Sequence, residues 1–118
     1  MSRSCPGFNI ADMNTTIEWY QDFLGYKCTF KVPNERVPPY AIVSNGDVSI
    51  HLSRDQTGSL AGTGFCYIEV KNVDELYSKL SKAGLIFVRD IEDSSYGMRD
   101  FVIKDYEGNQ ISFGENLN

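Results

Sequence analysis

Short segments of alternating apolar and polar residues run along the chain and predict a series of β-strands. The segments are residues 5–11, 26–32, 40–44, 47–53, 64–70, 85–89, 98–104 and 109–114. Turn signals at Asn45-Gly46 and Glu107-Gly108 join two pairs of these segments into hairpins. The polar stretch 90–97 predicts a loop that leads into the last hairpin.

A helical period lies between the first and second predicted strands. Ile17, Tyr20 and Leu24 recur at this spacing, and Gly25 is a typical helix stop. Thr15 and Glu18 match a capping box, which predicts Thr15 as the N-cap of the helix.

A second helical stripe follows the strand predicted at 64–70. Asn72 with Glu75 predicts its N-terminal cap, and Gly84 ends it. The apolar positions of this stripe are Val73, Leu76, Leu80 and Ala83. The order strand, helix and three strands therefore occurs twice along the chain.

The two halves also have glycines at corresponding positions. The helix stops Gly25 and Gly84 lie about half the chain apart, as do the hairpin glycines Gly46 and Gly108. This spacing indicates an internal duplication. Residue identity between the halves is low, so chance likeness within an ordinary α+β domain is the alternative.

Composition and charge narrow the classes of function. Of the 118 residues, 42% are hydrophobic and 13% are aromatic, which is enough for a packed core with aromatic side chains left to line a pocket. The net charge of −5 argues against a nucleic-acid partner, because phosphates require a basic surface. An acidic surface is compatible with a cationic ligand, although it also serves solubility alone.

The cysteines and the apolar runs bear on the compartment. Cys5, Cys28 and Cys66 are odd in number and lack a Cys-x-x-Cys spacing, which argues against a disulfide framework or a zinc knuckle. No apolar run is long enough to span a bilayer, and the N-terminus lacks the apolar core of a signal peptide. We therefore expect reduced thiols in a soluble, cytoplasmic protein.

Two longer stretches resemble the glyoxalase, bleomycin-resistance and extradiol-dioxygenase superfamily. The stretch from Asn9 to Phe30 has the pattern strand, aspartate, helix with an aromatic pair, and Leu-Gly-aromatic. These features are Asp12, Trp19-Tyr20 and Leu24-Gly25-Tyr26. The stretch from Tyr96 to Phe113 resembles the terminal hairpin of the superfamily. Its turn contains Asp105, Gly108 and Asn109, with Tyr106 where relatives usually have proline. With residues 72–84, the likeness covers nearly the whole chain.

The resemblance implies an α+β fold, the vicinal oxygen chelate fold, in which two βαβββ modules form a half-open barrel around a cleft. One module would span about residues 1–55 and the other about 62–118, within a single domain. Members are commonly dimers, so we expect a homodimer. Pro6 would redirect an N-terminal arm, and resistance proteins have a proline near this point. The alternative is that Pro6 only ends a frayed terminus.

Metal-dependent members take one His, Glu or Gln ligand from each of four strands. The resemblance places these positions at Cys5, His51, Phe65 and Ser112. Phe65 cannot bind a metal, and a neutral Ser112 is a poor ligand. Two remaining ligands do not hold a catalytic metal, so we expect no metal and no other cofactor.

Strand alternation identifies candidate ligand-binding side chains. Phe65, Tyr67 and Glu69 share the strand face opposite Cys66 and Ile68, and this face would line the cleft. Tyr96 lies in a polar loop, where an aromatic residue has little use for a core. The expected ligand-binding residues are Phe30, Tyr40, His51, Phe65, Tyr67, Glu69, Tyr96 and Ser112. The alternative for the aromatic members of this set is ordinary core packing, and for Glu69 a solvated rim.

These features favour a bleomycin-resistance-like binding protein that sequesters a planar, cationic drug or natural product without turnover. Aromatic faces and carboxylates suit such a ligand through stacking, cation–π contact and charge pairing. One alternative is a glyoxalase- or dioxygenase-like enzyme with an atypical or absent metal site, for which only His51 and Glu69 could form an acid–base pair. Another is a ligand-free interaction module whose cleft closes at a dimer interface.

Overall fold

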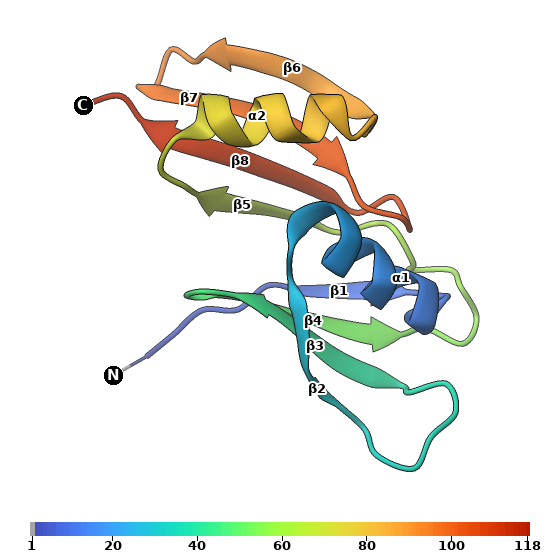
Figure 1. The fold of residues 1–118 in the computed structure, drawn as a ribbon. Coiled ribbons are helices and arrows are strands. Elements are labelled where there is room, and N and C mark those ends of the chain that lie inside the picture. Colours follow the sequence, from blue (N-terminus) through green and yellow to red (C-terminus); the bar gives the residue numbers. More distant parts are fainter. Residues whose placement is uncertain (1) are drawn as a thin grey trace. The chain divides into compact units, whose positions relative to one another are not determined.

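The computed structural model describes residues 2–118 and divides the chain into two compact units, each with one βαβββ series (Figure 1). The first unit runs to Gly64 and includes the segment Asp105–Asn109, and the second comprises Phe65–Lys104 and Gln110–Asn118. No helix within residues 2–118 has the length and apolar character needed to cross a membrane.

The first unit contains one four-stranded sheet. Its elements are β1 (Gly7–Ile10), α1 (Met13–Trp19), the π-helix η1 (Tyr20–Leu24), β2 (Lys27–Lys31), β3 (Tyr40–Asn45) and β4 (Val48–Arg54). The strand order is β1-β4-β3-β2, with β1 parallel to β4 and the other pairs antiparallel. The β2–β3 register shifts at a bulge between Cys28 and Phe30.

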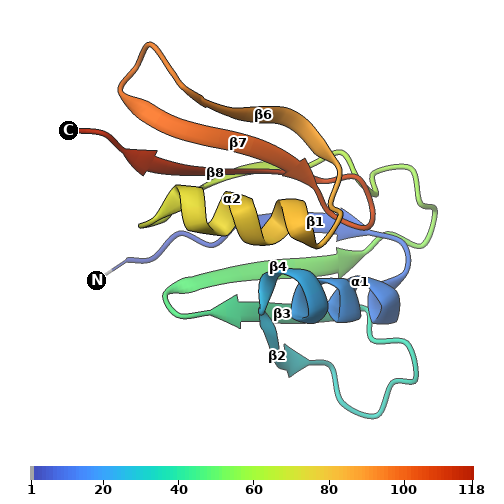
Figure 2. The ribbon, with the colours of Figure 1, turned by 45° about the horizontal axis from the view of Figure 1, so that its top comes forward.

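The second unit repeats this topology. Its elements are β5 (Phe65–Glu69), α2 (Val73–Lys82), β6 (Phe87–Asp93), β7 (Met98–Lys104) and β8 (Gln110–Asn116). The order is β5-β8-β7-β6, with β5 parallel to β8 and the other pairs antiparallel. Figures 1 and 2 show α2 lying along one face of this sheet. The predicted α+β class with two βαβββ modules is therefore confirmed.

Each helix covers the apolar face of the sheet in its own unit. In the first, Ile50 and Leu52 of β4 are fully buried, as their alternation predicts. In the second, an aromatic cluster joins α2 to the sheet. Its ring centroids lie 5.1 Å apart for Tyr77–Phe87, 5.5 Å for Phe87–Phe101 and 5.7 Å for Phe101–Phe113. Contacts of this kind add to the apolar burial that holds helix on sheet.

The predicted cap of the first helix is wrong, and that of the second is right in position only. Asp12 caps α1, because its carboxylate accepts from the backbone N–H of Thr15 at 3.2 Å and from the Thr15 hydroxyl at 2.9 Å. Asn72 is the N-cap residue of α2, as predicted, but its side chain makes no cap hydrogen bond and its backbone is left-handed, with φ of 59°. The cap of α2 comes instead from Glu115 at the end of β8, which accepts from the N–H groups of Asn72 and Val73 at 3.2 and 3.1 Å.

Two of the predicted connections also differ. In the first hairpin Asn45 pairs with Val48, so the turn residues are Gly46 and Asp47, one position later than predicted. Residues 90–93, predicted to lie in a loop, belong to β6, which runs to Asp93. Only Ser94 to Gly97 remain as the connection to β7.

The segment Asp105–Asn109, the turn of the last hairpin, is held by hydrogen bonds within the first unit. The Asp105 carboxylate accepts from three backbone N–H groups of this turn, each at 2.9 Å, and from the Tyr20 hydroxyl at 2.7 Å. Asn109 donates to the carbonyl of Asn9 at 3.3 Å and accepts from the N–H of Gly64 at 2.8 Å. Asp105 is thus a turn-forming residue, as expected from the sequence.

Candidate functional site

The face of the β5–β8 sheet opposite α2, called here the distal face, carries the candidate site. On β5, Cys66 and Ile68 are buried toward α2, while Phe65, Tyr67 and Glu69 are exposed on the distal face. This alternation confirms the predicted orientation of the three side chains. Phe65 is 61% exposed and Tyr67 is 38% exposed, so both rings are available for contact with another molecule.

Two tyrosines of this face meet at one carboxylate. The Tyr67 hydroxyl donates to Oδ2 of Asp100 at 2.8 Å, and the Tyr96 hydroxyl donates to the same oxygen at 2.6 Å. Asp100 lies on β7 and is fully buried, whereas Tyr96 lies in the β6–β7 turn and is 65% exposed. The sequence singled out both tyrosines, and the structure brings them together.

Gly114 makes room for the reach of Tyr67 to Asp100. Gly114 is the register partner of both Glu69 and Asp100, so it lies between β5 and β7 in the sheet. A Cβ atom at this position would lie 1.8 Å from the Tyr67 hydroxyl oxygen and 2.6 Å from its Cζ. The missing side chain therefore allows the phenol to lie across the strand, a close approach typical of glycine within strands.

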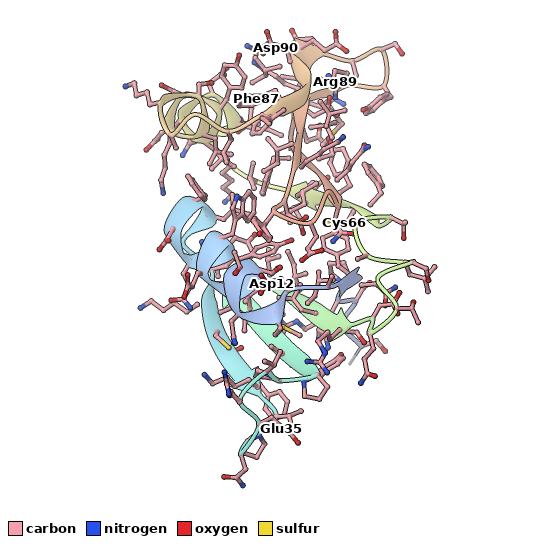
Figure 3. All side chains as sticks on the ribbon, turned by 90° about the vertical axis from the view of Figure 1, so that its right-hand side faces the viewer. Asp12, Glu35, Cys66, Phe87, Arg89 and Asp90 are labelled. Atoms are coloured by element: carbon pink, nitrogen blue, oxygen red, sulfur yellow. The ribbon has the colours of Figure 1, made fainter. Side chains whose placement is uncertain are left out.

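Arg89 completes the cluster because β6 is bulged. The β6–β7 register shifts between Phe87 and Arg89 and again before Glu92. Residues two apart on a regular strand share a face, but here Phe87 packs against Tyr77 of α2 and Arg89 pairs with Asp100. Figure 3 shows Phe87 directed toward α2 and Arg89 directed away from it.

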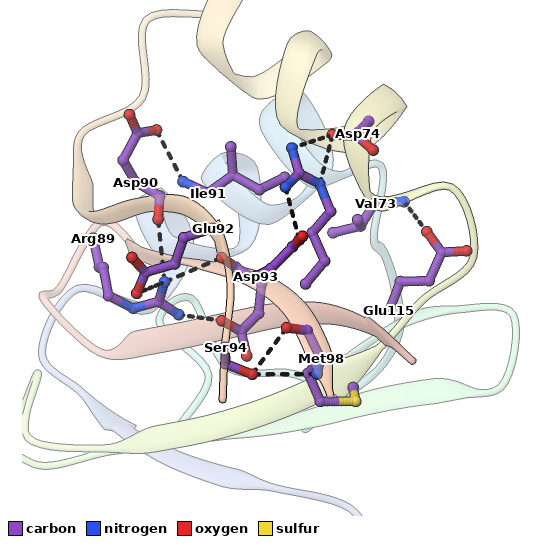
Figure 4. A network of polar contacts seen from close by, with 12 residues as sticks. Val73, Asp74, Arg89, Asp90, Ile91, Glu92, Asp93, Ser94, Met98 and Glu115 are labelled. Carbon is purple, nitrogen blue, oxygen red and sulfur yellow. Dashed lines mark hydrogen bonds and ion pairs between the residues drawn. The ribbon is translucent and has the colours of Figure 1, made fainter. Parts of the chain in front are cut away.

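The polar contacts of Arg89 are extensive. Its guanidinium donates to Oδ1 of Asp100, to Glu92 at 3.0 Å and to the carbonyls of Asp90 and Asp100 at 3.1 and 3.2 Å. Figure 4 shows Arg89 bonded to Glu92 and to the main chain of Asp90, with Ser94 and Met98 joined at the base of the turn. These bonds fix the turn that carries Tyr96.

The electrostatics of the cluster keep Asp100 ionised and the phenols neutral. Burial acts to raise the pKa of Asp100, but hydrogen bonds from Tyr96, Tyr67 and Arg89 outweigh it and hold that pKa below its usual value. Burial, followed by the hydrogen bond to Asp100, raises the pKa of Tyr67. The bond to Asp100 also raises the pKa of Tyr96.

The row of register partners through Asp100 is acidic. It runs Glu69, Gly114, Asp100 and Glu92 across the four strands, and Arg89 is the cation paired with its members. Three carboxylates against one guanidinium leave this part of the distal face negative. Such a surface favours a cationic ligand beside the tyrosine rings.

Ser112 also lies in the second unit, as the register partner of Tyr67 and Val102, but it is only 3% exposed. The remaining expected residues belong to the first unit. His51 and Tyr40 are joined by a hydrogen bond between His51 Nδ1 and the Tyr40 hydroxyl. Phe30, 48% exposed, pairs with Ile42, which pairs in turn with His51.

The residues present do not fit a catalytic metal. Within residues 2–118 no group of three or more His, Cys, Asp or Glu side chains is arranged to hold a metal ion. Of the four positions that the resemblance implies, Phe65 has no donor atom and Ser112 is buried as a hydroxyl.

Three contributors to the cluster were missed from the sequence: Arg89, Asp100 and Gly114. Arg89 was hidden because the bulges of β6 break strand alternation. A signal existed for the others. Asp100 shares a strand face with the apolar residues Met98 and Val102, which is unusual for a carboxylate. Gly114 lies in the last strand, where a glycine commonly marks a close approach.

Two βαβββ modules with this strand order define the class of protein. Residues 6–113 match the Glyoxalase/Bleomycin resistance protein/Dioxygenase superfamily. The chain belongs to this superfamily, as the resemblance implied.

Known relatives carry the names of bleomycin resistance proteins. The bleomycin resistance protein of Geobacillus stearothermophilus is 29% identical over 99% of this chain and 98% of its own length. The bleomycin resistance determinant encoded on the transposon Tn5 shares the fold, with a TM-score of 0.83 at 16% identity over 100% of both chains.

A second similar structure contains bleomycin. The bleomycin-binding protein from bleomycin-producing Streptomyces verticillus, complexed with copper(II)-bleomycin, matches with a TM-score of 0.78 at 24% identity. The match covers 96% of this chain and 94% of that chain. At these identities both structures establish the fold.

Proposed function

We propose that this protein binds and sequesters an extended, planar, cationic small molecule of the bleomycin kind, without turnover. The observation that carries the proposal is the pair of exposed tyrosines held to one buried carboxylate on an acidic sheet face. Fixed aromatic rings stack on planar ligands at little cost in conformational entropy, and neighbouring carboxylates pair with a cationic tail.

The relatives support the same proposal. A resistance protein that matches nearly the full chain, and a bleomycin-binding protein with the same fold, make bleomycin the natural first ligand to test. We further propose that the protein acts as a cytoplasmic homodimer, without metal or other cofactor and without nucleic-acid or membrane partners. A related natural product with a flat ring system and a cationic group would satisfy the same site.

Calorimetric titration with metal-free bleomycin and with copper(II)-bleomycin tests the proposal. We expect saturable binding that weakens as salt is added, because charge pairing between exposed groups is screened. Tyr77→Phe is a matched control, since it removes a tyrosine–aspartate hydrogen bond on the opposite side of the same sheet. Absence of binding by the folded protein would exclude bleomycin as the ligand.

The enzymatic alternative is separated by metal analysis and a glyoxalase assay on protein purified without a histidine tag. We expect metal well below one equivalent per chain and no glyoxalase activity. A stoichiometric transition metal, or turnover that depends on His51, would replace the binding role with a catalytic one.

A further inference from the structure

The hydroxyl hydrogens of Tyr67 and Tyr96 both form hydrogen bonds to one acceptor, the Asp100 carboxylate. Tyr67 and Tyr96 each donate to Oδ2 of Asp100, at 2.8 and 2.6 Å. A tyrosine hydroxyl has one hydrogen and two acceptor lone pairs. While Asp100 is ionised, it can accept both hydrogens and can donate none.

The charge on Asp100 is secured by Arg89. The guanidinium donates to the other oxygen of Asp100, and the carboxylate is fully buried in the cluster. Hydrogen bonds from Tyr96, Tyr67 and Arg89 together hold the pKa of Asp100 below its usual value. Asp100 is therefore an acceptor at neutral pH, and the orientation of both hydroxyls follows from its charge.

Arg89, the cation of the cluster, already has several hydrogen-bond partners. Arg89 donates to Asp100, to Glu92 and to two main-chain carbonyls. An oxyanion that entered beside the tyrosines would have to compete with these partners, and it would meet the carboxylates of Glu69 and Glu92 in the same row. Like charges at short range disfavour such a complex.

We infer that Asp100 makes Tyr67 and Tyr96 a paired hydrogen-bond acceptor, which selects ligand groups that donate N–H, such as amidinium or guanidinium, and rejects oxyanions. The inference rests on the proposed binding function and names the chemistry that its site recognises. Tyr96 is 65% exposed and Tyr67 is 38% exposed, so a ligand can reach the phenols. Asp100 acts through the tyrosines and is a positioning residue.

Benzamidine and benzoate provide the test, since they share ring and shape but carry an N–H donor and an oxyanion respectively. Titrations of tyrosine-labelled protein, followed by NMR, give the affinity of each probe together with the tyrosine signals. We expect benzamidine to shift the Tyr67 and Tyr96 signals saturably and benzoate to leave them unchanged. Equal affinity for the two probes, or no saturable shift with benzamidine, overturns the inference.

Variants then assign the selectivity to the phenols. Tyr96→Phe and Tyr67→Phe keep the rings but remove the acceptor oxygens, and each should weaken benzamidine binding by about tenfold, the usual effect of a hydrogen bond to a charged group. Tyr77→Phe, which removes the hydroxyl bonded to Asp90, should leave affinity unchanged. If both site variants bind benzamidine as tightly as the parent protein, the paired acceptor does not exist.

Asp100→Asn tests the positioning role. The guanidinium of Arg89 should keep the amide oxygen at the Oδ1 position, so the NH2 group replaces Oδ2, the acceptor that the two phenols share. An amide NH2 group donates and does not accept, so both hydroxyls lose their acceptor and the preference for benzamidine over benzoate should fall. Asp90→Asn is the matched control at the Tyr77 pair. An unchanged preference in folded Asp100→Asn overturns the positioning role. If the protein binds benzamidine selectively but does not bind bleomycin, the acceptor pair is supported and bleomycin is excluded as the ligand.

Discussion

Tyr96 and Tyr67 are bonded to the same carboxylate, but they differ in how much of each ring is free. Tyr96 is 65% exposed in a turn, whereas Tyr67 is 38% exposed and lies against Gly114 in the sheet. Removing the Tyr96 ring should therefore change ligand affinity with little effect on the fold. Removing Tyr67 should change both, since its ring also packs over the strand.

Tyr96→Ala should weaken the binding of bleomycin by about tenfold to a few hundredfold. A stacked ring contributes about 0.5–1.5 kcal/mol beyond its burial, and a well-desolvated cation–π contact adds roughly 2 kcal/mol. Calorimetry measures the affinity, and thermal unfolding should show only a small loss of stability, from the broken hydrogen bond to Asp100. Tyr106→Ala, another exposed aromatic, is the control. Unchanged affinity in both Tyr96→Ala and Tyr67→Ala would move the ligand to another surface.

Glu69→Gln should weaken the same binding less than Tyr96→Ala and should reduce its dependence on salt. Glu69 is exposed on the distal face, where screening by ions limits the value of a charge pair. Titrations at low and high salt measure the slope for the parent and the variant. Glu75→Gln, on the exposed surface of α2, should leave the slope as it is. A parallel loss in the two variants would exclude a local charge pair.

At the scale of helices and strands, long-range contacts decide what local sequence rules leave open. The alternation of residues 64–70 correctly predicted which side chains of β5 face away from α2, because that strand is regular. The acceptor of the first N–H groups of α2 could not be predicted from neighbouring residues, because Glu115 comes from the last strand. The position of Arg89 could not be predicted either, because bulges in β6 place its side chain on the sheet face opposite to the one that regular alternation gives.

Glu115→Ala should lower the free energy of unfolding by about 1–2 kcal/mol, because the first N–H groups of α2 lose their acceptor and a negative charge leaves the helix N-terminus. Chemical denaturation measures the change. Glu75→Ala tests the cap predicted from the sequence and should stay within about 0.5 kcal/mol of the parent. A larger loss of unfolding free energy for Glu75→Ala than for Glu115→Ala would show that the cap predicted from the local sequence stabilises the helix.

Asp105→Ala should cost about 3 kcal/mol or more in unfolding free energy. Three backbone N–H groups of the Asp105–Asn109 segment and the Tyr20 hydroxyl would lose their acceptor in a buried site. Denaturation again provides the measurement, with Tyr20→Phe as a control that removes the Tyr20–Asp105 bond and leaves the Asp105 carboxylate in place. A loss for Asp105→Ala no greater than that for Tyr20→Phe would mean that solvent replaces the backbone bonds.

For the molecule as a whole, the two units present the same strand order with different chemistry on their sheets. The first carries Phe30 and the Tyr40–His51 pair, and the second carries the tyrosine–aspartate cluster. The order of elements was readable because each module has its own helix and hairpin signals. The chemical difference was only partly readable, since Tyr67 and Tyr96 stand out in the sequence but their shared carboxylate does not.

The protein should be a homodimer in solution. The expectation comes from the resemblance to paired-module proteins and from the prediction that Pro6 redirects an N-terminal arm. Light scattering at micromolar concentration should give twice the mass of 13.3 kDa. A monomer mass that persists when bleomycin is added would require each chain to bind its ligand alone.

The bulges in β6 and β2 have a consequence for the amount of protein a cell can keep folded. Both strands lie at an outer edge of their sheets, where unpaired main-chain groups can recruit a strand from another molecule. Broken register, with lysines on β2 and mixed charges on β6, makes that recruitment unfavourable. If the protein captures its ligand without turnover, as proposed, it can protect only in proportion to its own abundance. Its resistance to aggregation would then limit the amount of ligand that it can bind.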